Sequence, residues 1–364
     1  MEENMYVPER EFVDAQAKPY DPVREMKRAV TKIGWKYTLF AIVVLAVDFI
    51  YALLLPEQYT QKDWAQFLGV IIAIYIIGFP FLLLLTMKMP KVKIEKKKMG
   101  FGDFFICILI NAGLCFIGMI VGLILETVVT LPFSFHPMEA EGMDLATLML
   151  SSGMFWRVFT VGICAPIVEE LIFRKLLIDR VVKHGEWLAI LLSGLMFGLY
   201  HGNFRQAVFA TLIGMFWAFI YIRTGKVWYT IAMHMIINLT TSVITVGLCQ
   251  FMLKYAEYIE DPNVTQQMMM GDVNAILSMV SMVLVILWLA ILTQIAFAGI
   301  ILFCVFIWYI CKNIKSNPKG IGMGKALGFG FFNLGMIVFW LLCIFKFVLA
   351  YGPLVVSTIE YIFS

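Results

Sequence analysis

Two adjacent glutamates, Glu169 and Glu170, lie in a long apolar stretch of the sequence, and Arg174 follows one helical turn later. On a helix, Glu170 and Arg174 share a face, so they can form an ion pair that compensates a buried charge. Glu169 projects about 100° away from Glu170 and is left without a cationic partner. A carboxylate in such a setting is suited to act as a general base or acid near neutral pH.

Two of the four histidines of the chain, His201 and His234, also lie in apolar stretches. Each has a companion at the i, i+4 spacing that places two side chains on one helical face: Phe197 precedes His201, and Asn238 follows His234. Ionisable groups in such stretches are costly to bury and therefore indicate function. We expect one carboxylate and two histidines from three helices to converge in the interior of a helical bundle.

This set of side chains could activate water in two ways. In the first, Glu169, His201 and His234 hold Zn²⁺ and leave one coordination position open for water. In the second, Glu169 acts with His201 directly. His234 and Asn238 then donate hydrogen bonds to the oxyanion that develops during the reaction. Both schemes use the same side chains, so the residue types leave the choice between them open.

The composition excludes an ordinary soluble protein. The chain is 61% hydrophobic and only 15% charged, whereas globular proteins have about 45–50% apolar and about 25% charged residues. The net charge of +3 is too small to suggest a nucleic-acid partner. We predict an all-α polytopic membrane protein, a bundle of about eight to nine transmembrane helices with a buried catalytic core of four. The apolar stretches behind this prediction lie near residues 38–55, 66–87, 104–131, 153–178, 187–201, 206–222, 228–249, 276–311 and 326–350.

Basic residues gather in alternate loops, and this pattern orients the chain. The loop from Lys88 to Lys98 is rich in lysine, whereas residues 131–153 contain no lysine or arginine. Because basic loops stay in the cytoplasm, we expect a cytoplasmic N-terminus and, in a bacterium, a plasma-membrane location. We divide the chain into a cytoplasmic arm (1–36), N-terminal membrane helices with an outer loop (37–152), a catalytic membrane core (153–249) and C-terminal membrane helices (250–364).

The polar motifs resemble the signature of a known family of membrane proteases. In chain order they are Glu169-Glu170-x-x-x-Arg174, Phe197-x-x-x-His201 and His234-x-x-x-Asn238. This pattern is similar to that of the CAAX protease and bacteriocin-processing family (CPBP, or Abi), which contains the type II CAAX prenyl endopeptidases. The resemblance covers roughly residues 150–245.

The resemblance implies an intramembrane endopeptidase that cleaves a membrane-associated protein or peptide. It makes Glu169 the water-activating base and His201 its partner, with His234 and Asn238 on the oxyanion side. It gives supporting roles to Glu170, Arg174 and Phe197. The family includes proteins labelled metalloproteases and others that look like metal-independent glutamate proteases, so zinc stays an open expectation. Two further functions fit the residues: a non-catalytic scaffold or immunity protein of the same fold, and a proton-coupled transporter.

Three features predict how the helices pack. Gly194 and Gly198 form a GxxxG pattern that lets one helix approach a neighbour closely. Pro166 cannot donate a backbone hydrogen bond and is expected to kink or open the helix just before Glu169. Residues 276–310 are expected to form one long helix, because neither Gly nor Pro lies near Gln294, where a turn would be needed to split it.

Isolated polar residues outside these motifs receive no catalytic role. Lys346 is expected to extend its amine toward the membrane surface. His184 is expected to lie in a solvated loop. Asp48 lies in the middle of a predicted span and has no partner that the sequence identifies.

Overall fold

The structure, a computed structural model, describes residues 21–133, 145–315 and 322–363, and this part of the chain is helical without strands. Parts of the predicted arm (1–20) and of the predicted outer loop (134–144) lie outside the described residues. The helices are α1 (Pro22–Leu54), α2 (Asp63–Val70), α3 (Phe79–Thr86), α4 (Phe101–Thr130), α5 (Leu145–Ser151), α6 (Met154–Trp156), α7 (Ala165–Glu170), α8 (Leu177–Val181), α9 (Glu186–Leu199), α10 (Phe204–Thr224), α11 (Val227–Asn238), α12 (Val246–Leu253), α13 (Ala256–Glu260), α14 (Val264–Met269), α15 (Val273–Asn313), α16 (Met323–Phe331) and α17 (Leu334–Phe363).

Short segments of other helical types join several of these helices end to end. Four are π-helical: η2 (Ile71–Gly78), η4 (Arg157–Cys164), η5 (Leu171–Leu176) and η7 (Leu239–Thr245). Three are 3₁₀ turns: η1 (Glu57–Tyr59), η3 (Leu131–Phe133) and η6 (Val182–His184). Through these junctions α6 to α8 form one continuous run, as do α2 to α3 and α11 to α12.

Seven helical runs of the described residues are long and apolar enough to cross a membrane: Pro22–Leu54, Asp63–Thr86, Phe101–Thr130, Phe204–Thr224, Val227–Leu253, Val273–Asn313 and Leu334–Val356. The prediction of an all-α polytopic membrane protein is confirmed. Two predicted stretches are helical but fall outside this set. The helix α9 has 14 residues, about 21 Å, against a hydrocarbon core of about 30 Å. The run from α6 to α8 has too many charged residues to count as an apolar membrane span, among them Glu169, Glu170 and Arg174.

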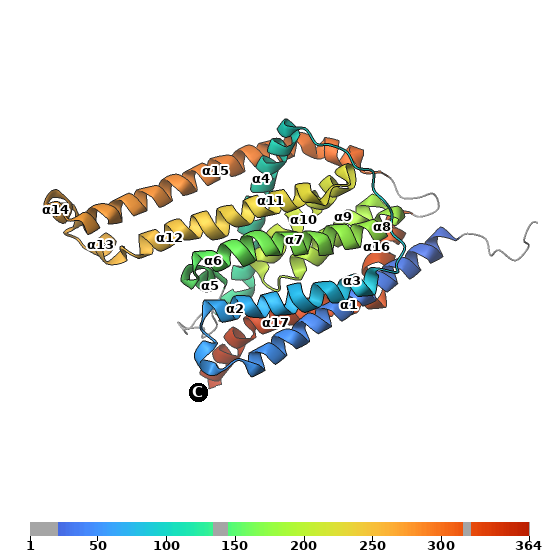
Figure 1. Ribbon diagram of the computed structural model, residues 1–364, viewed down its shortest axis with the longest axis horizontal. Coiled ribbons are helices and arrows are strands. Elements are labelled where there is room, and N and C mark those ends of the chain that lie inside the picture. The colour runs from blue at the N-terminus through green and yellow to red at the C-terminus, as the bar shows by residue number, and fades with distance from the viewer. Residues whose placement is uncertain (1–20, 134–144, 316–321, 364) are drawn as a thin grey trace, which may run out of the picture.

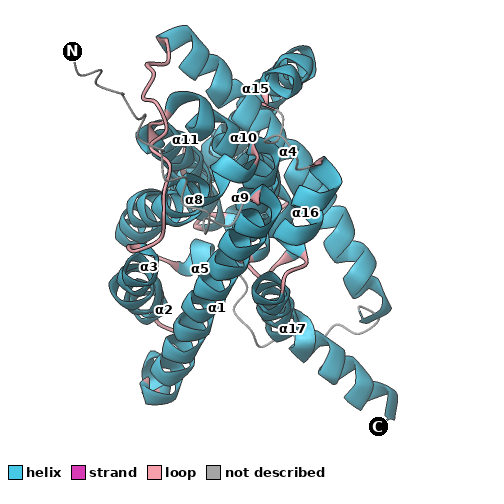
Figure 2. Cartoon of the chain, turned by 90° about the vertical axis from the view of Figure 1, so that its right-hand side faces the viewer, coloured by secondary structure: helices cyan, strands magenta, loops and turns pink. Residues whose placement is uncertain are grey.

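The predicted catalytic core lies at the centre of the bundle. Figure 1 shows α7, α9 and α10 between a layer of α1, α3 and α17 and a layer of α12 and α15, with α4 crossing behind. Seen from the end that carries α8 and α16, α9 and α10 again occupy the middle (Figure 2). Two-thirds of the α10 span (67%) is buried, against at most 33% of any other span. Ten of the 14 residues of α9 are buried as well. A helix too short to cross the bilayer is tolerated when protein surrounds it in this way.

The ends of the helices follow from local sequence. Asp21 caps α1 by accepting hydrogen bonds from the backbone N–H groups of Val23 and Arg24, and Pro22 occupies the first turn. The helix therefore begins well before residue 37, and the later part of the predicted arm is a helical extension of the first span. At the other end of the core, α10 stops at Gly225, whose φ of +61° favours glycine.

The predicted GxxxG surface is confirmed and faces α10. A methyl group added to Gly194 would meet Met215 and the carbonyl oxygen of Thr211, and one added to Gly198 would meet the Thr211 side chain and the carbonyl oxygen of Ala207. The backbones of α9 and α10 thus approach as closely as two helices can. This contact fixes the helix that immediately precedes His201.

Substituting Gly198 with Ala is expected to destabilise the protein by about 1–3 kcal/mol, because the new methyl group forces apart backbones that cannot yield. The measurement is the thermal unfolding midpoint of the purified protein in detergent. Gly247→Ala is the matched control, since nothing lies within 4 Å of a Cβ built on Gly247. Equal midpoints for the two variants would show that the close approach of α9 and α10 does not carry stability.

The segment predicted as one long helix is a single helix, α15. Its 41 residues make it about 62 Å long at 1.5 Å per residue, twice the thickness of the hydrocarbon core. Even with the greatest tilt seen in membrane helices it extends beyond the bilayer. In Figure 1, α13 and α14 lie at the far end of α12 and α15, beyond the rest of the bundle.

His184, predicted to be solvated, is buried instead, and that prediction was wrong. It ends η6 between α8 and α9 and is only 4% exposed, with no hydrogen-bond partner for its Nε2. Burial lowers the pKa of His184 from 6.5 to about 4, the charge of Lys183 acts in the same direction, and that of Glu25 opposes it. The sequence could not show this, because the tight turn that buries the ring depends on how α8 packs against α9.

Acidification is expected to destabilise the fold in part through His184. Its folded pKa lies below its unfolded pKa, so the unfolded state binds the proton more tightly. Stability from this group is complete above about pH 6.5 and falls as the pH decreases toward about 4. The His184→Phe variant should therefore lose less in thermal midpoint than the wild type between pH 7.5 and pH 5. Parallel midpoint curves for the two proteins would contradict this assignment.

Candidate active site

Pro166 changes the helical register just before the two glutamates. The N–H of Ala165 donates to the carbonyl of Thr160, five residues back, in the π register of η4. The next bond in that register would run from residue 166 to Val161, but proline has no N–H to donate. The side-chain amide of Asn238 donates to the Val161 carbonyl instead, at 2.8 Å. The predicted opening at Pro166 is thus present, and Asn238 of α11 closes it.

The predicted ion pair between Glu170 and Arg174 is confirmed and is fully enclosed. The Nε of Arg174 lies 3.1 Å from Oε2 of Glu170, and both side chains are 0% exposed. The guanidinium also lies over the ring of Phe197, at 4.3 Å from its centroid, and 5.1 Å from the ring of Trp217. Cations are attracted to aromatic faces, so the two rings contact the part of the charge that Glu170 does not.

His234 lies between the two glutamates. Its Nδ1 is 3.2 Å from Oε1 of Glu170, and its Nε2 is 3.8 Å from Oε2 of Glu169. A carboxylate oxygen accepts hydrogen bonds, so the Nδ1–H group of His234 is the donor to Glu170. The orientation of the imidazole is therefore set by Glu170, which is itself held by Arg174. The structure places His234, rather than His201, next to Glu169.

Glu169 differs from Glu170 in its surroundings. Its side chain is 22% exposed, whereas that of Glu170 is completely enclosed. One carboxylate is paired with a cation and the other is partly exposed, and the division of roles between them stays a prediction. Within the described ranges, the basic side chain at ion-pair distance from Glu169 is His234, at 3.8 Å.

His201 is held by its own backbone. It lies in the turn after α9 ends at Leu199, and its Nδ1 is 2.8 Å from the carbonyl oxygen of Phe197. A carbonyl can only accept, so Nδ1 carries the proton and the Nε2 of the neutral ring has a free lone pair. Among the residues that the structure describes, no hydrogen bond or ion pair joins His201 to Glu169. The predicted direct partnership of these two side chains is not formed.

Phe197 connects the two histidines by packing. Its ring is edge-on to His201 at 5.1 Å and to His234 at 5.7 Å between centroids, and it is almost fully buried. The supporting role predicted for it is consistent with these contacts. It also means that the two imidazoles lie on either side of a benzyl group, which keeps them apart.

Two residues make contacts near the site that the sequence did not predict. Trp217 of α10 packs against His234 with ring centroids 4.6 Å apart, and no motif marks it. Lys346 of α17 does not reach for the membrane surface as predicted. Its amine donates to the carbonyl of Tyr200 at the end of α9 and lies 4.1 Å from the Tyr200 ring centroid. A lysine at a helix C-terminus complements the helix dipole, so this contact steadies the turn that holds His201.

Asp48, which had no partner in the sequence, lies within electrostatic range of the same lysine. Asp48 belongs to α1 and Lys346 to α17, two helices that pack together along their length. An electrostatic interaction between two membrane helices depends on which helices pack side by side. No local sequence pattern shows this.

The side chains predicted as zinc ligands do not come together as one site in the described residues. Three ligands were predicted, Glu169, His201 and His234, but in the described part of the chain no three His, Cys, Asp or Glu side chains are gathered so that they could hold a metal ion. Nδ1 of His201 faces a carbonyl and Phe197 stands between the two imidazoles. In this arrangement the residues do not fit a tetrahedral zinc site, and zinc stays a prediction.

The segment that carries the candidate site matches a family of known proteins. Residues 151–240 match the family described as type II CAAX prenyl endopeptidase Rce1-like. The chain is also similar to "Putative membrane peptidase YdiL" of Bacillus subtilis (strain 168), with 30% identity over 115 residues, which is 31% of this chain. It spans 45%, less than half, of that relative's length. No solved structure matches. The resemblance drawn from the motifs is confirmed.

Proposed function

We propose, from the match of residues 151–240 to the Rce1-like endopeptidases, that this membrane protein hydrolyses a peptide bond of a membrane-associated protein or peptide. The observation that carries the proposal is a buried chain of contacts. Arg174 is 3.1 Å from Glu170, Glu170 is 3.2 Å from His234, and His234 is 3.8 Å from Glu169. Only the last member of the chain is partly exposed.

Glu169 acts as the general base in this proposal. Its carboxylate takes a proton from water while the water oxygen attacks the carbonyl carbon of the scissile bond. The tetrahedral intermediate then expels the amine, and the proton held by Glu169 passes to that nitrogen. The atoms balance: one water is consumed, one C–N bond breaks, and a new acid and a new amine leave.

His234 positions Glu169 and interacts with its carboxylate as the charge of that carboxylate changes during the reaction. Because Nδ1 of His234 is tied to Glu170, its Nε2 faces Glu169 in a fixed orientation. Arg174 pairs with Glu170 and holds it in place, so the first three members of the contact chain form a rigid support. The support is enclosed by Phe197 and Trp217, which exclude water from it.

Asn238 serves the oxyanion side, and His201 contacts another part of the substrate. The Nε2 of His201 carries a lone pair in this arrangement, so it can accept a hydrogen bond from a substrate N–H or O–H. Asn238 uses one N–H of its amide on Val161 and has a second one for the carbonyl oxygen that becomes negative. The reading that His201 activates water together with Glu169 requires the two side chains to approach each other when a substrate binds.

The substrate in this proposal reaches the site from the membrane or its surface. The site lies in the most enclosed helices of the bundle, and the lysine-rich loop, α8 and the start of α1 lie at one end of it (Figure 1). Placing this basic end in the cytoplasm gives a cytoplasmic N-terminus, and for a bacterial chain the plasma membrane is its location.

The test compares membrane-associated peptides by mass spectrometry in cells that express the protein and in cells that lack it. Candidate products are then synthesised as uncut substrates and incubated with the purified protein in lipid nanodiscs. We expect cleavage of at least one of them, and no loss of cleavage after dialysis against a chelator if the glutamate scheme operates. Loss on chelation with recovery on adding zinc would instead support the zinc scheme. Identical peptide profiles across good coverage would favour a non-catalytic scaffold.

A further inference from the structure

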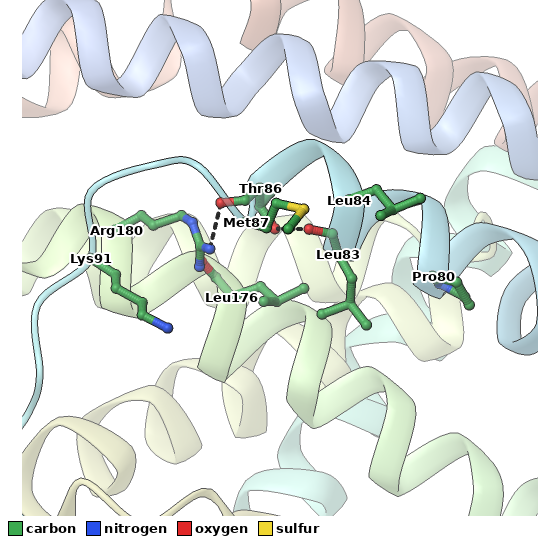
Figure 3. A pocket seen from close by; sticks show the side chains of 8 residues that line it. All are labelled: Pro80, Leu83, Leu84, Thr86, Met87, Lys91, Leu176 and Arg180. Carbon is green, nitrogen blue, oxygen red and sulfur yellow. Dashed lines mark hydrogen bonds between the residues drawn. The ribbon is translucent and has the colours of Figure 1, made fainter.

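A cavity of about 480 Å³ lies between the end of α3 and the last turns of the run that carries the two glutamates (Figure 3). This volume is within the range of about 300–1,000 Å³ found for small-molecule sites. It lies away from the contact chain of the candidate active site: Leu176, at its edge, follows Glu169 by about 10 Å along the helix axis. Neither the family match nor the proposed reaction assigns it a ligand.

One half of the cavity is apolar and open to the surroundings. Pro80, Leu83 and Leu84 of α3 and the adjacent Met87 line this half, and Leu84 is 66% exposed. These residues belong to the end of a predicted membrane span. Their exposed surface therefore faces hydrocarbon rather than water, and an apolar chain would lie against them without cost.

The other half is cationic. Figure 3 shows the side chains of Lys91 and Arg180 together at the end of the cavity opposite Pro80 and Leu84. Arg180 is only 5% exposed; it donates to the carbonyls of Leu176 at 2.8 Å and of Thr86 at 2.7 Å, and its Nε has no partner. Lys91 is exposed, and in the ranges that the structure describes it makes no hydrogen bond or ion pair.

No carboxylate lines the cavity to neutralise these two charges. The acid closest in sequence is Asp179, which lies within electrostatic range of Arg180 but outside the cavity lining. Its carboxylate is engaged by Lys175 at 2.6 Å and by the hydroxyl of Tyr221 at 2.6 Å. The backbone of the lysine-rich loop is fixed next to the cavity, because the N–H of Val92 donates to the carbonyl of Asp179 at 2.6 Å. The cavity thus keeps a net positive end at a set distance from its apolar end.

We propose that this cavity binds one anionic phospholipid. The phosphodiester lies between Lys91 and Arg180, where the amine of Lys91 and the terminal N–H groups of Arg180 that its two carbonyl partners leave unused supply donors. One acyl chain follows Leu83, Leu84 and Met87 along the outer face of α3. A negative head beside an apolar tail, at the end of a membrane span and next to a basic loop, is the shape and charge that this cavity complements.

The experiment measures lipid retention by native mass spectrometry. The full-length protein is exchanged into detergent with phosphatidylglycerol or phosphatidylcholine at equal concentration. We expect bound phosphatidylglycerol to exceed bound phosphatidylcholine by about tenfold, and Lys91→Glu to reduce phosphatidylglycerol retention about fivefold or more. Lys96→Glu is the matched control, because it changes the net charge equally, lies in the same exposed loop and does not line the cavity. It should leave retention near the wild-type value.

A second pair of measurements separates a lipid from a free anion. Leu84→Trp is expected to fill the apolar half and lower lipid retention without any change in charge, and because Leu84 is exposed the variant should fold. Inorganic phosphate at millimolar concentration should not displace the lipid. Displacement by phosphate would overturn the lipid in favour of a soluble anion. Equal retention in wild type, Lys91→Glu and Leu84→Trp would overturn the site altogether.

Discussion

Replacing Glu169 by Gln is expected to lower kcat/KM for peptide hydrolysis by about 10²–10⁴-fold, the range that a positioned general base contributes. The amide has the size of the carboxylate but cannot take a proton from water. Folding should be preserved, since Glu169 is partly exposed and makes its charged contact with His234 at the long distance of 3.8 Å. The measurement is the rate of cleavage by purified wild type and variant in lipid nanodiscs, with the thermal midpoint recorded on the same samples.

Glu126→Gln is the matched control for this prediction. Glu126 belongs to α4, and its carboxylate pairs with Arg205, outside the contact chain of the candidate site. The same chemical change there should leave the rate within about twofold of wild type. A Glu169→Gln protein that keeps the wild-type rate would remove the general-base role, whatever the other variants do.

Breaking the buried pair between Glu170 and Arg174 is expected to have the largest effect on stability. Glu170→Gln leaves an enclosed guanidinium without its counter-ion, which costs about 3–5 kcal/mol. Arg174→Met should be similarly damaging, because a buried carboxylate then loses its cation. The double variant carries neither charge, so its loss should be smaller than the sum of the two single losses by about 2–3 kcal/mol. Equilibrium unfolding in mixed micelles measures all four proteins.

The pair of Glu126 and Arg205, which is partly exposed, provides the comparison. Arg205 is 56% exposed, so the same cycle made with Glu126→Gln and Arg205→Met should give a coupling of at most about 1 kcal/mol. Additive losses in the Glu170 and Arg174 cycle would contradict the assignment of a coupled buried pair. The rate loss in Glu170→Gln has a different cause from that in Glu169→Gln. It comes through the position of His234, so KM and the pH profile should shift along with kcat.

Features that depend on one helix were predictable from the sequence. The ion pair of Glu170 and Arg174 and the glycine face of α9 each join two residues four apart in one helical run, and such residues stay neighbours even where η5 turns π-helical. The membrane spans follow from hydropathy alone, and the long α15 from the absence of Gly and Pro near Gln294. Local sequence is sufficient for each of these because no second helix has to be placed.

Features that depend on how two helices pack against each other were not predictable from the sequence. The partner of Glu169 was predicted as His201 from the resemblance of the motifs, but α9 ends at Leu199 and the imidazole of His201 turns back to Phe197. His234 reaches Glu169 because α11 packs against α7, and nothing in either segment records that register. The interior position of Lys346 was missed for the same reason, since a lysine in a span reads as one that extends to the surface.

The hydrogen bond between Asn238 and Val161 couples the evolution of positions 166 and 238, which are far apart in the sequence. A proline at 166 removes a donor from one helix, and an amide at 238 supplies it from another, so neither residue can be exchanged freely while the other stays. Related chains that keep the proline should keep an amide or another donor at the second position. Chains that have lost it are free to vary there. The asparagine would then be inherited in part as a repair to a backbone, even where its role toward a substrate has changed.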